Sequence, residues 1–152
     1  FQTLQTSVPV KVVTSFDKEL PPFPVDAHLM RQALINLVVN AAQAMPRGGL
    51  VSVTARIERL GAVPWLVVEV CDEGLGLSAR ATEKIFQPFF TTKATGTGLG
   101  LAVVKRIVDS HGGEVTARAN PVRGTTFVVR LPGGSEREGT MTPPRPSPAA
   151  PR

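Results

Sequence analysis

The stretch Gly96-Thr97-Gly98-Leu99-Gly100-Leu101 places glycine at alternate positions, directly before a segment with helical periodicity at residues 99–111. Free amide groups at a helix N-terminus, together with the helix dipole, attract anions, and glycine lets a phosphate group approach the backbone closely. The spacing differs from the dinucleotide-binding pattern Gly-x-Gly-x-x-Gly and from the phosphate loop Gly-x4-Gly-Lys-Ser/Thr. The stretch therefore predicts either a phosphate-binding loop or a glycine-rich hinge that holds no ligand.

The segment just before this loop is rich in phenylalanine. Residues 86–93 read Phe-Gln-Pro-Phe-Phe-Thr-Thr-Lys and hold three of the seven phenylalanines of the chain. We expect a loop over residues 86–97, in which the phenylalanines could anchor a mobile lid by packing on the domain. A loop that only caps the core is the alternative, and the two are compatible because a lid must dock on something.

A second glycine-rich turn, Asp72-Glu73-Gly74-Leu75-Gly76, follows the apolar run of residues 65–71, which is typical of a central strand. A carboxylate at the end of such a strand is partly buried, and this is costly unless it is hydrogen-bonded. Asp72 is either a turn residue that binds its own backbone amides or an acceptor for the exocyclic amine of adenine. In the second case it rejects guanine, whose O6 would face the carboxylate. Gly74 and Gly76 would let the backbone approach a flat base.

A polar stripe runs along the helix expected over residues 27–45. Its members share one helix face at spacings of four, four and three residues: Gln32, Asn36, Asn40 and Gln43. A solvated face explains the two glutamines well, but Asn36 and Asn40 lie among apolar residues. An amide oxygen is a ligand that suits Mg²⁺. The stripe therefore indicates either a solvated face or part of a magnesium site.

The order of the expected elements predicts the fold class. We expect strands over 8–16, 51–57, 65–71, 115–119 and 126–131, and helices over 27–45, 78–85 and 99–111. Asp26 is the expected N-cap of the first helix, residues 61–64 an expected turn, and Gly112–Gly113 the expected left-handed end of the last helix. Two consecutive strands precede the first glycine turn and two end the domain. This order favours an α/β two-layer sandwich with a mixed β-sheet over a doubly wound fold.

Length and composition bound the domain organisation. The chain has 152 residues, enough for one domain, and 42% hydrophobic residues, which permit a buried core. Beyond Pro132 the composition shifts to Gly, Ser and Pro. We expect residues 1–132 to form the folded domain and residues 133–152 a disordered tail. Because the chain begins at Phe1, we interpret it as a piece of a longer protein.

Charge and cysteine content exclude several classes of protein. The net charge is +5, but the basic residues are scattered, and only Lys105 and Arg106 are adjacent. No aromatic residues interleave with them, so we expect no nucleic-acid binding. One cysteine, Cys71, excludes an internal disulfide framework and fits a reducing, cytoplasmic location. No apolar run approaches the roughly 20 residues that cross a bilayer, so we expect no membrane contact by this domain.

Taken in order, these segments resemble the ATP-binding catalytic domain of sensor histidine kinases, within the superfamily of gyrase B, chaperone and mismatch-repair ATPases. The resemblance covers residues 26–131. The matching segments are an asparagine box (31–41), a first glycine box (72–76), a phenylalanine box (86–90), a second glycine box (96–101) and a closing glycine box (124–127). Each box is unspecific alone, but five in this order are highly specific.

The resemblance implies a site for ATP and Mg²⁺ between the helices and the loop. Asn40 would bind Mg²⁺, and Asn36 would order its ligand shell. Asp72 would hold the adenine amine with Thr125 behind it, and Lys93 would steady the phosphates under a lid over residues 89–97. The implied catalytic residues are Asn36, Asn40 and Lys93. The implied nucleotide-binding residues are Asn36, Asn40, Asp72, Gly74, Gly76, Lys93, Gly96, Thr97, Gly98, Leu99, Gly100, Leu101 and Thr125.

Two departures from the family pattern stand out. Many members carry Lys or Arg three residues after the second Asn of the asparagine box, where this chain has Gln43. A basic phosphate contact is therefore absent at that position. The segment between the phenylalanine box and the second glycine box is also short, which suggests a compact lid.

The reaction follows from which groups can accept a proton or a phosphoryl group. Hydrolytic members of the superfamily place Glu where this chain has Asn36, which cannot take a proton. Positioning without a base suits phosphoryl transfer to a nucleophile supplied from elsewhere. Neither His28 nor His111 lies in the context of a phosphoacceptor. We therefore place the acceptor histidine on a dimerisation domain N-terminal to Phe1.

Our main hypothesis is transfer of the ATP γ-phosphoryl group to that histidine, with ADP as product, and onward to the receiver domain of a response regulator. Two alternatives stay open. One is a serine kinase of the anti-sigma type, which shares the boxes. The other is a module that senses nucleotide without catalysis, which Gln43 mildly favours.

Overall fold

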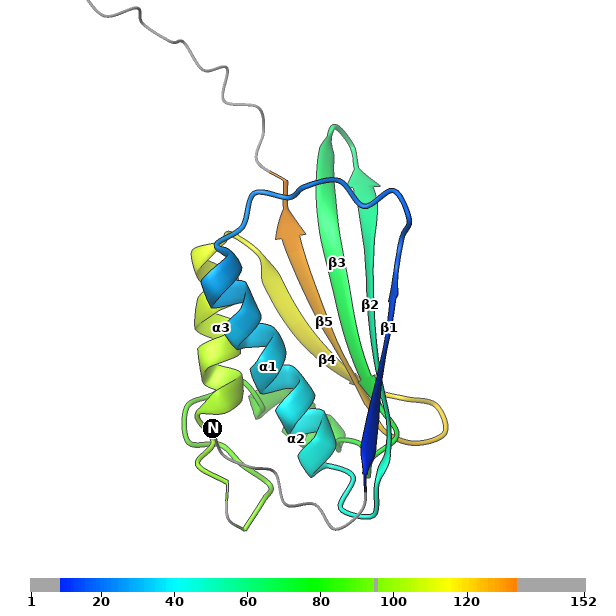
Figure 1. The fold of residues 1–152 in the computed structure, drawn as a ribbon. Helices are drawn as coiled ribbons and strands as arrows, with labels where there is room; N and C mark the ends of the chain where they lie inside the picture. The colour runs from blue at the N-terminus through cyan, green and yellow to red at the C-terminus, as the bar shows by residue number, and fades with distance from the viewer. Residues whose placement is uncertain (1–8, 95, 134–152) are drawn as a thin grey trace, which may run out of the picture.

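The sheet is mixed, as predicted. The computed structural model describes residues 9–94 and 96–133. In chain order the elements are β1 (Val10–Phe16), α1 (Ala27–Gln43), β2 (Gly49–Leu60), β3 (Val63–Asp72), α2 (Ala79–Lys84), α3 (Gly100–Ser110), β4 (Glu114–Ala119) and β5 (Thr125–Pro132). The strand order is β1-β2-β3-β5-β4, with β1 parallel to β2 and the other neighbours antiparallel. The two-layer α/β sandwich is confirmed (Figure 1).

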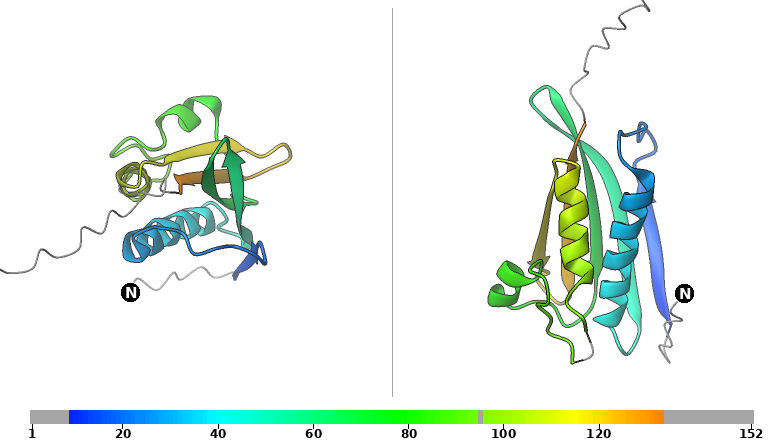
Figure 2. Two further views of the ribbon diagram at one scale, coloured as in Figure 1. Left: turned by 90° about the horizontal axis from the view of Figure 1, so that it is seen from above. Right: turned by 90° about the vertical axis from the view of Figure 1, so that its left-hand side faces the viewer.

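Helices α1 and α3 pack side by side on one face of the sheet and enclose the core (Figure 2). Leu37 of α1 and Val104 of α3 are fully buried against Val70 and Phe127 of the central strands. Full burial of side chains of this size contributes about 1.5–3 kcal/mol each. Phe86 packs edge-on against Phe127, with ring centroids 6.2 Å apart. Phe86 and Phe90 therefore dock the phenylalanine-rich segment on the core, as expected, whereas Phe89 is 76% exposed and does not anchor it.

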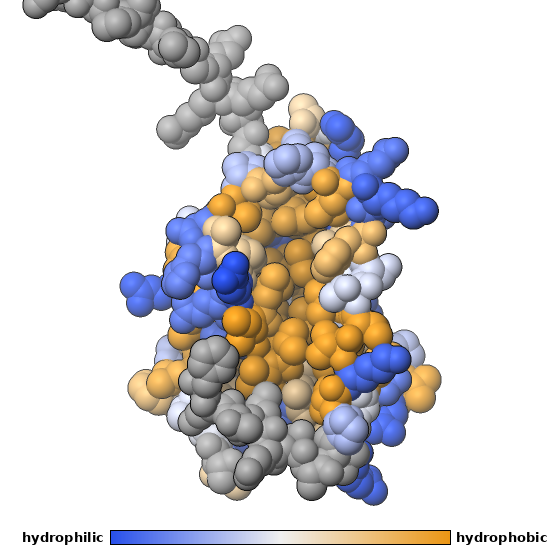
Figure 3. Space-filling model, in the orientation of Figure 1, coloured by the Kyte–Doolittle hydropathy of each residue, from blue (hydrophilic) through white to orange (hydrophobic). Residues whose placement is uncertain are grey.

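The edge strand β1 is covered less completely than the strands beside it. Its register pairs Val12 with Val51 and Phe16 with Ala55, so Val12 and Phe16 share the helix-facing side of the sheet. They are nevertheless 48% and 55% exposed, and Ile35 of α1 is 54% exposed. In Figure 3 apolar side chains gather in the hollow between α1 and this edge.

Local contacts fix both ends of α1. Asp26 caps the helix, since its Oδ1 accepts hydrogen bonds from the amides of His28 and Leu29 at 2.9 and 3.0 Å. The backbone N–H of Asp26 in turn donates to Nε2 of His111 at 3.0 Å, and Nδ1 of His111 lies 2.8 Å from the carbonyl of Ile107. His111 therefore ties the end of α3 to the start of α1.

The expected turn over residues 61–64 is wrong in its extent. Only Gly61 and Ala62 form the turn, while Val63 and Pro64 pair with Leu60 and Arg59 in the ladder. Gly61 has φ +65°, and glycine at the first position of a two-residue loop matches the twist of a hairpin. β2 also extends to Leu60, three residues beyond the expected end, because the hairpin turn is so short.

The expectation that both Gly112 and Gly113 are left-handed is also wrong. Gly112 has φ +68°, but Gly113 has no positive φ. A Cβ on Gly113 would lie 2.3 Å from the carbonyl oxygen of Arg130 and 2.7 Å from Cδ2 of Leu131. Gly113 is therefore needed because the chain after α3 passes very close to β5.

Two helix ends and two strand ends lie at the same end of the molecule. The C-terminus of α1, the N-terminus of α3, the end of β3 at Asp72 and the start of β5 at Thr125 all lie at the lower end in Figure 1. Over residues 9–94 and 96–133, no helix is both long and apolar enough to cross a bilayer. The tail expected at residues 133–152 lies outside the described residues, apart from Gly133.

Candidate functional site

A cavity of about 400 Å³ opens where α1 ends and α3 begins. The residues predicted for the site that line it are Asn36, Asn40, Lys93, Gly96, Thr97, Gly98, Gly100 and Leu101, and Gln43 lines it as well. The other predicted residues do not line it: Asp72, Gly74, Gly76, Leu99 and Thr125. A larger hollow of about 550 Å³, lined by residues 17–21 with Ile57 and Arg59, contains none of the predicted residues.

The polar stripe of α1 divides into two parts. Nδ2 of Asn36 donates to the carbonyl of Gly100 at 3.3 Å and so connects α1 to the start of α3. The side-chain oxygens of Asn40 and Gln43 accept hydrogen bonds from Nζ of Lys93 at 3.0 and 2.8 Å. Gln32 is exposed and does not line the cavity. A solvated face therefore explains Gln32, whereas the other three residues surround the cavity.

Asp72 is buried to 1% exposure, and its two carboxylate oxygens differ. Oδ1 accepts hydrogen bonds from the amides of Gly74 at 2.8 Å and Thr125 at 3.2 Å. Oδ2 is buried and has no hydrogen-bond partner among the described residues. Burial raises the pKa of this carboxyl above its ordinary value, while the two amides and the charge of Lys93 act against the rise. A buried acceptor without a partner is costly, so Oδ2 is suited to a donor from a ligand.

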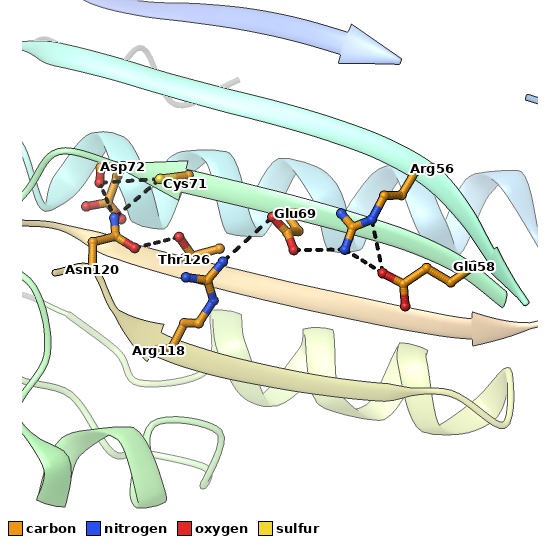
Figure 4. Close-up of polar contacts among 8 residues, drawn as sticks. All are labelled: Arg56, Glu58, Glu69, Cys71, Asp72, Arg118, Asn120 and Thr126. Atoms are coloured by element: carbon orange, nitrogen blue, oxygen red, sulfur yellow. Dashed lines mark hydrogen bonds and ion pairs between the residues drawn. The ribbon is translucent and has the colours of Figure 1, made fainter. Parts of the chain in front are cut away.

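The backbone around Asp72 is held by Asn120, a residue that sequence reasoning missed. Nδ2 of Asn120 donates to the carbonyl of Asp72 at 3.1 Å, and its Oδ1 accepts from the hydroxyl of Thr126 at 2.6 Å (Figure 4). Gly124, at φ +90°, also lies against Asp72, because a Cβ there would be 1.9 Å from the Asp72 carbonyl oxygen. An asparagine in a turn is ordinary in a sequence, so nothing in the pattern pointed to this role.

Chain packing explains several glycines of the boxes. A Cβ on Gly74 would meet the carbonyl oxygen of Ala44 at 2.7 Å, and one on Gly96 would meet Oγ1 of Thr91 at 2.5 Å. Gly98 has φ +69° and touches the backbone of Phe89, whose amide donates to the Gly98 carbonyl at 2.9 Å. These three glycines therefore fit the chain to itself.

Gly100 is different, because a Cβ there would meet nothing within 4 Å. It is the first residue of α3, and the N-cap residue Leu99 makes no side-chain capping hydrogen bond. The N-terminus of α3 thus presents backbone amides beside open space in the cavity. That combination favours the phosphate-binding interpretation of residues 96–101 over a hinge without a ligand.

Lys93 brings a positive charge to the end of α1. Its side chain is half-buried, and desolvation lowers its pKa, while the negative charge of Asp72 acts in the opposite direction. Its hydrogen-bond acceptors on α1 are neutral oxygens. No carboxylate among the described residues forms an ion pair with Lys93, so its charge is available to an anionic ligand.

Comparison with known proteins places this geometry in a family. Residues 25–135 match the family described as histidine kinase-, DNA gyrase B-, and HSP90-like ATPases. The chain belongs to this ATPase family. The resemblance seen in the order of the boxes is thereby confirmed.

Similar proteins within this ATPase family include histidine kinases. The sensor histidine kinase ZraS of Escherichia coli K12 is 43% identical over 113 residues, which are 74% of this chain and 23% of the relative. The solved catalytic domain of histidine kinase ThkA has a TM-score of 0.67 and 34% identity, and the match covers 82% of this chain and 79% of that one.

A solved full-length ShkA in complex with AMPPNP has a TM-score of 0.68 and 28% identity over 83% of this chain and 26% of that one. The present chain spans about a fifth to a quarter of the length of the first curated relatives it matches, with shares of 23% and 21%.

The residues of this candidate site fit a magnesium ion whose ligands come mostly from water and phosphate. Asn40 offers a neutral oxygen at the cavity wall. Among the described residues there is no group of three or more His, Cys, Asp or Glu side chains that could hold a metal. Mg²⁺ needs few protein ligands when it binds together with phosphate groups, so a single amide oxygen is chemically sufficient.

Proposed function

We propose that this chain is the ATP-binding catalytic domain of a sensor histidine kinase. It transfers the γ-phosphoryl group of ATP to a histidine on a phosphoacceptor domain outside this chain. The observation that carries the proposal concerns Oδ2 of Asp72, which has no hydrogen-bond partner among the described residues and is buried at the end of the molecule where the open N-terminus of α3 lies. One end of the molecule thus offers an acceptor for a purine amine and donors for phosphate.

Asp72 recognises adenine in this proposal. Oδ1 is fixed by two backbone amides, which would leave Oδ2 to accept a hydrogen bond from the exocyclic amine. Guanine would present O6 to the same carboxylate and be repelled. Thr125 supports Asp72 from β5, while Gly74 and Gly76 leave the flanking backbone free of side chains.

Asn40 and Lys93 act on the phosphate end of the nucleotide. Asn40 would supply the amide oxygen for Mg²⁺, whose role when bound is to neutralise and orient the phosphates. Asn36 holds the start of α3 through the Gly100 carbonyl. Lys93 and the amides of residues 98–101 would then hold the terminal phosphates, with Gly96 and Thr97 at the cavity wall.

The cavity favours transfer over hydrolysis. The described residues that line it include no Asp, Glu or His, so none of its neutral side chains can take a proton from water. Neither His28 nor His111 lines the cavity, and Nε2 of His111 already accepts a hydrogen bond from the backbone amide of Asp26. We therefore infer that the nucleophile comes from another domain.

Histidine is the acceptor class that the relatives favour over serine, because ZraS and ThkA are both histidine kinases. From this we infer that the present domain is cytoplasmic and that the acceptor histidine, on the separate phosphoacceptor domain, passes the phosphoryl group to the receiver domain of a response regulator. A module that binds nucleotide without transfer is the competing candidate.

The test joins this chain to the phosphoacceptor domain of its own parent protein and supplies ATP labelled at the γ-phosphate. We expect label on the acceptor domain that is lost in acid and stable in base, as a phosphohistidine is. Base-labile, acid-stable label would indicate a serine kinase. Bound ATP without any transfer would support a sensing module and contradict the proposal.

A further inference from the structure

Three oxygens at the C-terminal end of α1 hold the ammonium group of Lys93. Nζ lies 2.8 Å from Oε1 of Gln43, 3.0 Å from Oδ1 of Asn40 and 3.4 Å from the carbonyl oxygen of Asn40. Lys93 belongs to the segment between α2 and α3, so these contacts connect the loop over the cavity to the helix below it.

Gln43 makes no other side-chain hydrogen bond among the described residues, and it is exposed at the last position of α1. Its contact with Lys93 is therefore the one specific interaction that the structure gives this side chain within residues 9–94 and 96–133.

Asn40 and Gln43 differ in whether a second cation is expected to bind their side-chain oxygens. Oδ1 of Asn40 is the oxygen assigned above to Mg²⁺, and two cations on one oxygen repel each other. No metal ion is assigned to Oε1 of Gln43. When the metal and nucleotide bind, Gln43 can keep the ammonium that Asn40 has to release.

We propose that Gln43 is a positioning residue, which retains Lys93 on α1 and so presents its positive charge to the terminal phosphates of ATP. The part concerning ATP rests on the proposed function, whereas the retention of Lys93 can be measured without nucleotide. Gln43 then supplies no charge of its own. It holds the charge of Lys93 at the C-terminal end of α1, where many family members carry a Lys or Arg in place of Gln43.

The first experiment is limited digestion of the chain by trypsin without nucleotide. Trypsin must take the lysine side chain into its own pocket, so a held Lys93 is a poor substrate. Gln43→Leu should speed cleavage after Lys93, relative to cleavage after the exposed Lys18, about three- to tenfold, the effect of losing one hydrogen bond. Gln43→Glu keeps an oxygen and should restore protection.

Gln32→Leu is the matched control, because Gln32 is exposed on the same helix and does not line the cavity. It should leave cleavage after Lys93 unchanged. Unchanged cleavage in Gln43→Leu, or equal acceleration in both variants, would overturn the proposal.

The second experiment measures ATP and AMP binding by calorimetry with Mg²⁺. Gln43→Leu should weaken ATP binding about three- to tenfold and leave AMP binding unchanged, because AMP lacks the terminal phosphates. In the double variant with Lys93→Met, the loss should equal that of Lys93→Met alone, since both changes remove one interaction. Fully additive losses, or equal losses for AMP, would contradict the role of Gln43. If the unaltered chain binds no ATP, the proposed function fails, and the digestion still decides whether Gln43 holds Lys93.

Discussion

Asp72 illustrates how one side chain can serve both interpretations of its sequence. Oδ1 makes the turn-type hydrogen bond to the amide of Gly74, as a structural aspartate would. Oδ2 remains buried without a partner among the described residues, as a recognition residue would. The two hypotheses made from the sequence were therefore not exclusive, because each concerns a different oxygen.

Replacing Asp72 by asparagine separates the two oxygens. In Asp72→Asn, the amide oxygen can keep the contacts with Gly74 and Thr125, while the NH₂ group takes the place of Oδ2. A donor would then face the adenine amine, so ATP affinity should fall about tenfold or more. The affinity for GTP should fall less, because the O6 of guanine gains a hydrogen-bond donor. Calorimetry with both nucleotides measures the ratio of the ATP and GTP affinities, and an unchanged preference for ATP would refute the assignment of Asp72.

Asp72 also predicts a pH dependence of stability. Burial raises the pKa of its carboxyl above the ordinary value of 3.8, so the folded state disfavours the ionised form. The destabilisation begins as pH rises through 3.8 and is complete above the folded-state pKa. Asp72→Asn removes the charge and should therefore gain most in melting temperature near pH 7 and least below pH 3.8.

Thermal melts of both proteins across this range test the sign. A gain that is larger in acid than at neutral pH would contradict the account of the buried charge.

At the scale of elements, the N-terminus of α3 can be tested through Gly100. Gly100→Ala adds a methyl group that meets nothing within 4 Å, and alanine is a better helix former than glycine. We expect the variant to be at least as stable as the unaltered chain. Its ATP binding should be several-fold weaker, because the methyl group occupies space that we assign to phosphate. A melt and a titration of the same sample measure both, and undiminished ATP affinity would argue against phosphate at this position.

Gly113→Ala is the contrasting control at the other end of α3. Its Cβ would lie 2.3 Å from the carbonyl oxygen of Arg130, so the backbone must shift. Overpacking of this kind costs about 1–3 kcal/mol. The free energy of unfolding should therefore fall in Gly113→Ala and not in Gly100→Ala.

Local patterns predicted the elements well and their close contacts poorly. Periodicity and the cap at Asp26 gave the position of α1, and alternation gave β2 apart from its ends. The turn near Gly61 was predicted too long, because proline at position 64 reads as a loop residue until its place in the ladder is known. Gly113 was assigned a left-handed conformation because the sequence does not reveal that Arg130 lies against it.

The candidate site was predictable where a residue type carries its own chemistry. The resemblance pointed to Asn40, Asp72 and Lys93, and two of these line one cavity. Asn120 and Gln43 were missed as positioning residues, since their partners Asp72 and Lys93 lie 48 and 50 positions away. Contacts over such separations are set by the fold and leave no local pattern.

At the scale of the whole molecule, the two histidines lie away from the cavity. His111 joins the end of α3 to the start of α1, whereas the cavity lies at the C-terminal end of α1. We expect this chain to bind Mg²⁺ and ATP without labelling His28 or His111. Incubation with γ-labelled ATP and mass spectrometry of the two peptides test this, and label on either histidine would contradict an external acceptor.

The most direct test of the central claim is calorimetric titration of this chain with ATP, ADP and GTP, each with and without Mg²⁺. We expect saturable ATP binding that Mg²⁺ strengthens, binding of ADP, and no comparable binding of GTP. A folded chain that ignores adenine nucleotides at millimolar concentration, or takes GTP as readily as ATP, would contradict it.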